Sequence, residues 1–430
     1  MKKKKSSRRR GCGCSTLILL VIVFAVGIYV GKNNIGGFSD NGLFELFEEY
    51  VSRAVEAAGD KLSALFGSDE EKETPHLSEE GATGEFTEID GVDYTVFRTM
   101  YKSLSRDGKY AYEAIYRAAL NHEEKVFIPA LSEEELCDVH AALKYDNPQI
   151  PCFSDEISYG SIGAISYVNL IYTYTEEACG EASQSLIEAA KKLCAECGDL
   201  DEYGRELYLH DKLIKNAEYS DDGISSHNAV GALVHGKGVC ASYTLAMKLL
   251  LDVSGIESCV VRGTAENEDG AEAHVWLLVK IDGNWYHLDP TWNDPVSDDG
   301  ESVCVHTYFN LTTESISADH SEFTLPDFIS SDDTGANYFV RGGLMCGEDD
   351  WRDVIRSNIA RHIEDGPCDV EFCFENEELY EEAFSELKEY ALNDMIRSAV
   401  VNNGLSVGSW TTCTQTFEGM NTVHYIITLD

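Results

Sequence analysis

The segment GALVHGKGVCASYTLAMKLLLDVSG, residues 231–255, places one cysteine between a glycine-containing turn and a stretch with helical periodicity. Leu245 and Leu249 recur at helical spacing, and Gly255 is a typical residue just beyond a helix end. The sequence therefore predicts a helix that begins at or near Cys240. Unpaired backbone N–H groups and the positive end of the helix dipole stabilise a thiolate there, so this cysteine is a candidate nucleophile.

A hairpin downstream supplies a candidate base. In EAHVWLLVKIDGNWYHLDPTWNDP, residues 272–295, two alternating runs flank an Asp-Gly pair at 282–283, a strong signal for a two-residue turn. With that turn, Trp276 lies opposite Asp289, and His274 becomes the diagonal neighbour of Asp289 on the same face. Such neighbours are roughly 7 Å apart at the backbone and within side-chain reach. The other face is predicted to be apolar and to face the core: Val275, Leu277, Val279, Ile281, Tyr286 and Leu288.

Cys240, His274 and Asp289 have the residue types of a catalytic triad. A carboxylate bonded to one imidazole nitrogen fixes the tautomer and leaves the other nitrogen to take the thiol proton. A single histidine on a strand is more often a structural polar residue, and a single cysteine in an apolar helix is more often part of the core. The three residues together, at a helix start and on facing strands, favour catalysis over coincidence.

These residues resemble the transglutaminase-like superfamily of cysteine enzymes, in its bacterial exported branch. The resemblance is carried by GKGVCASYTLAMKLLLDVSGIESCVVRGTA and AHVWLLVKIDGNWYHLDPTW, with weaker similarity in LYLHDKLIKNAEYS, AALKYDNPQIPCFS and HTYFNLTTESISADH. It implies an α+β fold with a papain-like, transglutaminase-like core, in which a helix bearing Cys240 packs on an antiparallel sheet bearing His274 and Asp289. It also implies that Cys240 is the nucleophile, His274 the general base and acid, and Asp289 its orienting partner.

The chemistry implied by the resemblance is acyl transfer through a thioester, by a peptidase or transamidase acting on peptide or glutamine amide bonds. The family commonly has Gly at the position of Ser242 and Asn at the position of Leu277, so the substrate pocket is expected to differ. Two other functions stay open: a catalytically silent domain that binds peptide or glycan, and a surface scaffold that recruits partners. The candidate pocket residues are Trp276, Trp285, Ser242 and Tyr243.

The N-terminus combines a basic block with an apolar stretch. Seven Lys and Arg residues precede residues 14–31, which carry no charge and are just long enough to span a membrane as a helix. Because the positive charges precede the apolar stretch, residues 1–13 are expected in the cytoplasm and the catalytic domain outside the cell. The sequence thus predicts a single-pass protein of the cell membrane. A cleaved signal peptide is the competing interpretation, although no convincing cleavage site ends the apolar run.

The rest of the chain divides by composition. Residues 40–66 are predicted to form a juxtamembrane amphipathic helix, because apolar residues recur on one face, and residues 43–66 could pair with a second copy. Residues 67–85 are acidic and poor in large apolar groups, which is typical of a linker. The globular part is predicted to comprise a lead-in α+β region, a catalytic domain and a small C-terminal α/β module: 86–200, 201–325 and 326–430.

Charge and cysteine content limit the partners. The chain has 33 basic and 76 acidic residues, a formal net charge of -43, which repels phosphate and argues against nucleic acid. Protein or peptide substrates of the cell envelope are expected instead, with no cofactor and no metal. The acidic stretch 293–301 suggests calcium, which is not favoured because the ligand order of a calcium loop is missing. Cys194 and Cys197 have C-x-x-C spacing, but packing or a local disulfide is favoured over a zinc site.

Overall fold

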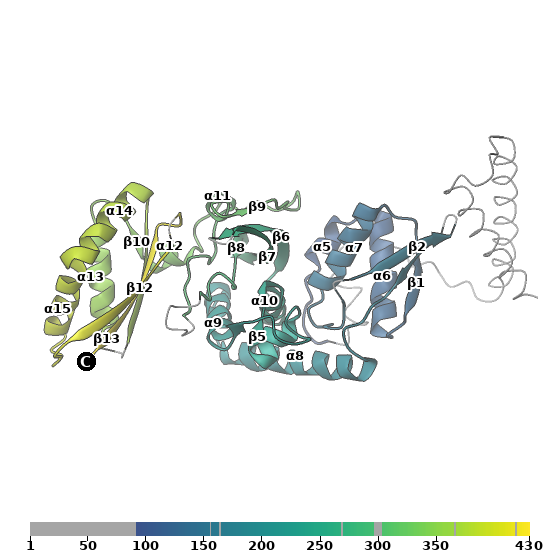
Figure 1. Ribbon diagram of the computed structural model, residues 1–430, viewed down its shortest axis with the longest axis horizontal. Helices are drawn as coiled ribbons and strands as arrows, with labels where there is room; N and C mark the ends of the chain where they lie inside the picture. Colours follow the sequence, from purple (N-terminus) through teal and green to yellow (C-terminus); the bar gives the residue numbers. More distant parts are fainter. Residues whose placement is uncertain are drawn as a thin grey trace, which may run out of the picture. The chain divides into compact units, whose positions relative to one another are not determined.

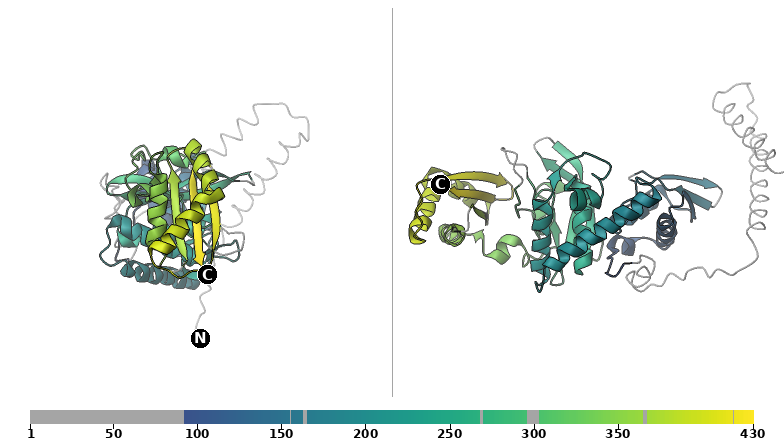
Figure 2. Two further views of the ribbon diagram at one scale, coloured as in Figure 1. Left: turned by 90° about the vertical axis from the view of Figure 1, so that its left-hand side faces the viewer. Right: turned by 90° about the horizontal axis from the view of Figure 1, so that it is seen from below.

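The computed structural model describes residues 92–154, 156–162, 165–267, 270–295, 303–364, 367–417 and 419–430 (Figure 1, Figure 2). All of them belong to the second of two units into which the chain divides, Pro75–Asp430. The predicted basic tail, transmembrane helix, amphipathic helix and acidic linker lie outside the described residues. Within the described ranges, no helix combines the length and the apolar character that crossing a membrane requires.

The first described part is a small α+β unit. Its elements are α5 (Thr99–Ser103), α6 (Arg106–Leu120), α7 (Glu133–Tyr145), β1 (Lys125–Ile128), β2 (Ser158–Ile162) and β3 (Ile165–Asn169). The strands form an antiparallel sheet of order β1-β3-β2, on which α6 packs. Helix α7 begins with a capping box, in which Ser132 and Glu135 satisfy each other's backbone N–H groups. A disulfide between Cys152 and Cys179 joins this part to the helix that follows.

The central part combines helices with a four-stranded sheet of order β8-β7-β6-β9, in which all pairs are antiparallel. Its helices are α8 (Glu176–Glu196), α9 (Glu202–Lys215), the π-helix η1 (Gly231–His235), α10 (Cys240–Ser254) and α11 (Thr313–Ile316). Its sheet strands are β6 (Ser258–Asn267), β7 (Gly270–Ile281), β8 (Asn284–Leu288) and β9 (His320–Ser321). Two short parallel strands, β4 (Glu218–Tyr219) and β5 (Lys237–Gly238), pair just before α10.

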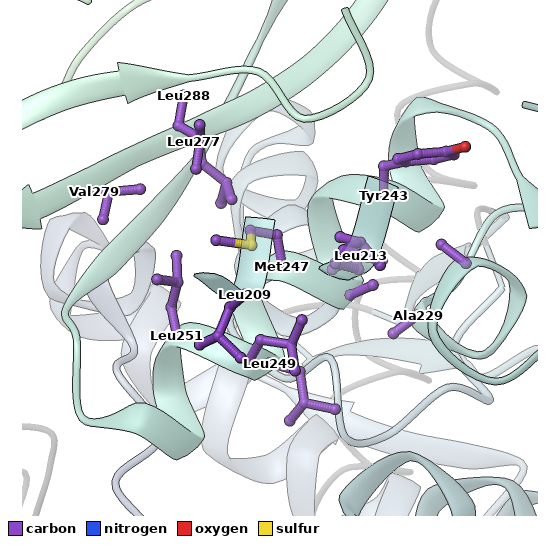
Figure 3. Close-up of a cluster of buried hydrophobic side chains, with 14 of the residues drawn as sticks. Leu209, Leu213, Ala229, Tyr243, Met247, Leu249, Leu251, Leu277, Val279 and Leu288 are labelled. Atoms are coloured by element: carbon purple, nitrogen blue, oxygen red, sulfur yellow. The ribbon is translucent and has the colours of Figure 1, made fainter. Parts of the chain in front are cut away.

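Helix α10 lies at the centre of the core, and its apolar side chains pack against the sheet (Figure 3). The hairpin face that the sequence predicts as apolar is buried in the same cluster, from Val275 to Leu288. Burying a side chain such as Leu249 stabilises the fold by roughly 1.5–3 kcal/mol. A hydrogen bond from Oγ1 of Thr244 to the Val275 carbonyl, at 2.9 Å, joins α10 directly to β7. This packing fixes the start of α10, and with it Cys240, beside the hairpin.

A buried ion pair connects α10 to the lead-in part. Nζ of Lys248 lies 2.5 Å from Oδ1 of Asp252, and both side chains are fully buried. The same oxygen accepts a hydrogen bond from the backbone N–H of Phe97, at 3.4 Å. Because a charge buried without a partner costs several kcal/mol, each member of the pair depends on the other.

The C-terminal part consists of helices packed on a four-stranded sheet and is called the C-terminal module below. Its elements are α12 (Tyr338–Gly342), β10 (Met345–Cys346), α13 (Trp351–His362), β11 (Cys368–Phe374), α14 (Glu377–Glu386), the π-helix η2 (Leu387–Ala391), α15 (Leu392–Asn402), β12 (Trp410–Phe417) and β13 (Thr422–Leu429). The sheet order is β10-β11-β13-β12, and the long helices cover one face of it (Figure 1). The edge strand β12 was not predicted from the sequence, because its side chains are mostly exposed and polar.

Candidate active site

Cys240 is the first residue of α10, as predicted, and its side chain is partly exposed. The residue before it, Val239, is extended, and its carbonyl accepts a hydrogen bond from the Ser242 N–H at 2.8 Å. Gly236 ends the π-helix in the left-handed region, with φ of 69°, which favours glycine. A side chain at Gly238 would collide with that of Ser242. The turn therefore requires glycine at both positions to bring Cys240 to the helix start.

The β7–β8 hairpin brings His274 and Asp289 into contact. Leu277 pairs with Leu288, which is the register predicted from the Asp-Gly turn. Nε2 of His274 lies 2.6 Å from Oδ2 of Asp289. The two residues are 4% and 0% exposed, so water screens their interaction only weakly.

Cys240 extends this contact to a third side chain. The Cys240 sulfur helps to raise the pKa of the His274 imidazole, whose Nε2 already faces Asp289, so Nδ1 is the nitrogen available to the thiol. Burial alone lowers the pKa of His274, but Asp289 and Cys240 outweigh burial and raise that pKa to about 10. The structure therefore favours a protonated His274 across the neutral pH range.

Asp289 is held by four hydrogen bonds. Its Oδ1 accepts from the backbone N–H groups of Thr291, at 2.9 Å, and Trp292, at 3.2 Å. Its Oδ2 accepts from His274 and, at 3.1 Å, from Nε2 of His320. Burial raises the pKa of Asp289, but the two histidines reverse the effect and hold the pKa well below its usual range. Asp289 is therefore a fixed carboxylate that orients His274.

Two residues of this site, His320 and Trp292, were missed by sequence reasoning. His320 lies in β9, where its neighbour in the ladder is Ala265 of β6, and it is fully buried. The ring of Trp292 is 6.0 Å from that of His274 and 4.7 Å from that of His320. The only sequence signal for His320 was its place at the end of a segment that resembles the family. Trp292 likewise ends a segment that resembles the family, 273–292, but nothing in the sequence assigned it a role.

The two tryptophans proposed as pocket walls are buried in this structure. Trp276 is 0% exposed, and its Nε1 donates to Nδ1 of His287 at 2.9 Å. Trp285 is 7% exposed and belongs to the same apolar cluster as Trp276. Their side chains pack within the described residues because the second face of the hairpin is covered by residues such as Phe323 and Ile329.

Ser242 and Tyr243 are also buried rather than open to a pocket. Oγ of Ser242 donates to the Asn228 carbonyl at 2.5 Å and accepts from the Ala232 N–H at 2.8 Å. The hydroxyl of Tyr243 donates to Oδ2 of Asp294 at 2.5 Å. Both side chains therefore fasten the start of α10 to neighbouring segments.

Tyr219 borders the site from the side of β4. Tyr219 pairs with Gly238, two residues before Cys240, and its side chain is 46% exposed. Burial, followed by the nearby Cys240 sulfur, raises the pKa of Tyr219. An exposed aromatic residue beside the sulfur gives a substrate a surface on which to pack.

One group at the site has the donor atoms of a metal centre. His274, Asp289 and His320 each offer an atom within 4.8 Å of the others. Both histidines already contact Oδ2 of Asp289 through Nε2, so the group is explained as a hydrogen-bonded network. We assign no metal to it.

Comparison with solved structures finds several weak similarities, of which three are described here. A candidate cysteine protease from Cytophaga hutchinsonii is 18% identical, with a TM-score of 0.23, over 35% of this chain and 65% of that one. A TGase is 12% identical, with a TM-score of 0.22, over 39% and 50%. The periplasmic domain of TgpA from Pseudomonas aeruginosa is 14% identical, with a TM-score of 0.21, over 39% and 68%. The chain spans less than two thirds of the first two proteins, and these scores are too low to support an argument.

The sequence of the central part gives a clearer result. No curated protein matches the chain. Residues 191–290 match the model of the family described as "Transglutaminase-like superfamily". The matched range begins within α8 and includes Cys240, His274 and Asp289. The chain therefore contains a domain of the transglutaminase-like superfamily.

Proposed function

We propose that this protein is a cysteine enzyme that transfers acyl groups from peptide or glutamine amide bonds. Cys240 is the nucleophile, His274 the general base and acid, and Asp289 the carboxylate that orients His274. One observation supports the proposal most strongly: the thiol, the imidazole and the carboxylate interact in series, because His274 is hydrogen-bonded to Asp289 at 2.6 Å and the Cys240 sulfur helps to raise the pKa of the same imidazole. That series places a nucleophile, a proton acceptor and an orienting group in the order that acyl transfer requires.

The first half-reaction forms a thioester. Nδ1 of His274 already holds the proton that it shares with the Cys240 sulfur, and the sulfur lone pair forms a bond to the substrate carbonyl carbon. The carbonyl π electrons move to oxygen, and the backbone N–H of Cys240 at the start of α10 stabilises that charge. His274 then gives its proton to the leaving nitrogen as the carbon–nitrogen bond breaks, which releases an amine or ammonia.

The second half-reaction releases the acyl group and regenerates the free enzyme. His274 takes a proton from water or from a second amine, and that nucleophile attacks the thioester carbonyl. The carbon–sulfur bond breaks, the sulfur leaves with the bonding electrons, and His274 again holds the proton. Water gives hydrolysis, and an amine gives transamidation. Asp289 keeps Nε2 of His274 engaged throughout, so that Nδ1 remains directed at the sulfur.

The proposed location is the outer face of a cell membrane, with a single N-terminal span and envelope proteins or peptides as substrates. The basic block followed by the uncharged residues 14–31 supports this location. Protease treatment of intact cells tests it. In untreated cells the protein should be found in the membrane fraction. Protease added to intact cells should digest the catalytic domain, and full protection of that domain would contradict the proposal.

A paired activity screen tests the function. The full chain is incubated with a glutamine-containing protein and a fluorescent primary amine, and in parallel with a quenched peptide library. We expect label incorporation or peptide cleavage that is lost in Cys240→Ala and retained in Cys137→Ala, an exposed cysteine in another part of the fold. Equal activity in Cys240→Ala would refute the assignment. Substrate binding without turnover in the wild type would instead indicate a catalytically silent module.

A further inference from the structure

A second cluster of metal-binding side chains lies outside the candidate active site. His210 and Asp211 are adjacent in α9, and Cys304 and His306 lie in the segment between β8 and α11. Each of the four residues has one donor atom within 4.8 Å of the others. The two histidines and the cysteine are buried, so the cluster is not a loose gathering of surface groups.

Oδ1 of Asp211 contacts each of the other three side chains of the cluster. It lies 2.9 Å from Nε2 of His306, 3.7 Å from Sγ of Cys304 and 3.1 Å from Nδ1 of His210. Around a tetrahedral zinc ion with bonds of about 2.0–2.3 Å, neighbouring ligand atoms are about 3.3–3.8 Å apart. The separations of Asp211 from His306 and from Cys304 are therefore close to this spacing, and the Cys304 and His306 donor atoms lie within 4.8 Å of each other.

The outer contacts distinguish ligands from supporting groups. Nδ1 of His306 lies 2.7 Å from Oε1 of Glu371 on β11, which leaves Nε2 to bind a metal. His210 differs, because its Nε2 faces the amide nitrogen of Asn293 at 3.0 Å. The amide oxygen of Asn293 accepts from the Tyr308 N–H, which fixes the orientation of the amide. The proton of His210 is therefore on Nδ1, where it donates to Asp211.

We propose that Asp211, Cys304 and His306 bind a divalent cation of the zinc class, with water in the fourth position. A thiolate, an imidazole and a carboxylate form a ligand set that zinc accepts. Binding releases the thiol proton of Cys304 and one imidazole proton to solvent. His210 supports the Asp211 carboxylate, and Glu371 orients His306 as in the carboxylate–histidine–metal arrangement of known sites.

The position of the site indicates its role. Asp211 comes from α9 of the central part, whereas Glu371 comes from β11 of the C-terminal module. Glu371 contacts His306 twice, because its Oε2 also accepts from the His306 backbone N–H at 2.8 Å. A metal at this point would fasten the module to the central part. The proposal does not depend on the proposed acyl transfer.

Cobalt substitution tests the proposal. The full chain is purified in detergent with Cys240→Ala, so that the active-site thiol cannot bind metal, and is titrated with Co²⁺. We expect one equivalent to give a thiolate-to-cobalt absorption band and the visible bands of tetrahedral cobalt. Cys304→Ser should abolish the thiolate band, whereas Cys346→Ser, at a buried cysteine of the module, should retain it.

A milder variant provides a second test that remains informative if the Cys304→Ser protein does not fold. Glu371→Gln keeps the size of the side chain and should weaken Co²⁺ and Zn²⁺ binding by about 10–100-fold. Absence of a thiolate band in the parent protein, or a band that persists in Cys304→Ser, overturns the proposal. An unchanged affinity in Glu371→Gln would also overturn it. In those cases the cluster is a metal-free network in which His306 bridges Asp211 and Glu371.

Discussion

His320 and His274 share a single acceptor, Oδ2 of Asp289, at 3.1 Å and 2.6 Å. Nδ1 of His320 lies 2.5 Å from Oδ1 of Asp319, so both nitrogens of His320 face carboxylates. Burial lowers the pKa of His320, but these two carboxylates outweigh it and raise the pKa. His320 therefore acts on the candidate triad as a positioning residue, through Asp289.

Exchanging His320 for Asn should therefore impair catalysis without preventing binding. The shorter amide cannot reach Asp289, so we expect kcat to fall about tenfold, or ~1.4 kcal/mol, with little change in KM. The alkaline limb of the pH–rate profile should also move, because the charge environment of Asp289 and His274 changes. Gln places its amide nitrogen near the position of Nε2 and should restore most of the rate. An unchanged kcat in His320→Asn, with the exposed His362→Gln as control, would rule out the positioning role.

The raised pKa of His274 predicts a pH dependence of stability. The folded pKa is about 10, above an ordinary value of 6.5. The protonated form is thus stabilised by folding, so the contribution is fully present below about pH 6.5 and is lost as pH rises through about 10. Urea denaturation of wild type and His274→Gln should show the difference in unfolding free energy shrinking across that interval. A constant difference would contradict the assignment.

The buried pair Lys248–Asp252 should be sensitive to loss of one partner. Lys248→Met leaves the Asp252 carboxylate unpaired in the core and should cost about 3–5 kcal/mol of unfolding free energy. Exchanging both residues, in Lys248→Met with Asp252→Leu, should recover most of that loss. The exposed pair Arg397–Asp394 is the control, because Arg397→Ala should change stability by less than about 1 kcal/mol. Denaturant unfolding measures the unfolding free energy of all three variants. If the double variant does not recover stability, the loss in Lys248→Met is not caused by an unpaired buried charge.

Ser242 gives a prediction about the position where the family commonly has glycine. Ser242→Gly removes the hydroxyl that satisfies the Ala232 N–H and donates to the Asn228 carbonyl. Because a buried polar group left unpaired costs about 1–3 kcal/mol, thermal unfolding should show a loss in that range. KM for a small substrate should change little, because the side chain is buried. A large change in KM with unchanged stability would instead support the prediction that Ser242 lines the substrate pocket.

Local patterns account for the features that the sequence predicted. The Asp-Gly turn sets the register of β7 and β8, which fixes which residues face His274. Glycines and helical spacing locate the start of α10 within one residue of Cys240. Both signals lie within short segments, so single-sequence reasoning can detect them. The predicted membrane segment and the helix 40–66 fall outside the described residues and stay predictions.

Contacts between distant segments account for what the sequence missed. His320 reaches Asp289 only because β9 pairs with β6. In that pairing His320 lies opposite Ala265, which is 55 positions earlier in the chain. Asp211 and Glu371 meet at His306 although they lie in separate parts of the fold. The burial of Trp276 and Trp285 depends on segments that cover the hairpin from outside. None of these relationships leaves a periodic pattern in the chain.

The alkylation rate of Cys240 tests directly whether His274 activates this cysteine as a nucleophile. Iodoacetamide labelling at neutral pH, followed by peptide mass spectrometry, compares Cys240 with the exposed Cys137 and Cys413 in the same molecule. We expect Cys240 to react faster than either reference cysteine in the wild type. In His274→Gln the alkylation rate of Cys240 should fall to that of Cys137 and Cys413, whose own rates should not change. If Cys240 reacts at the same rate as the two reference cysteines in the wild type, or if His274→Gln leaves its rate unchanged, Cys240 is not an activated nucleophile.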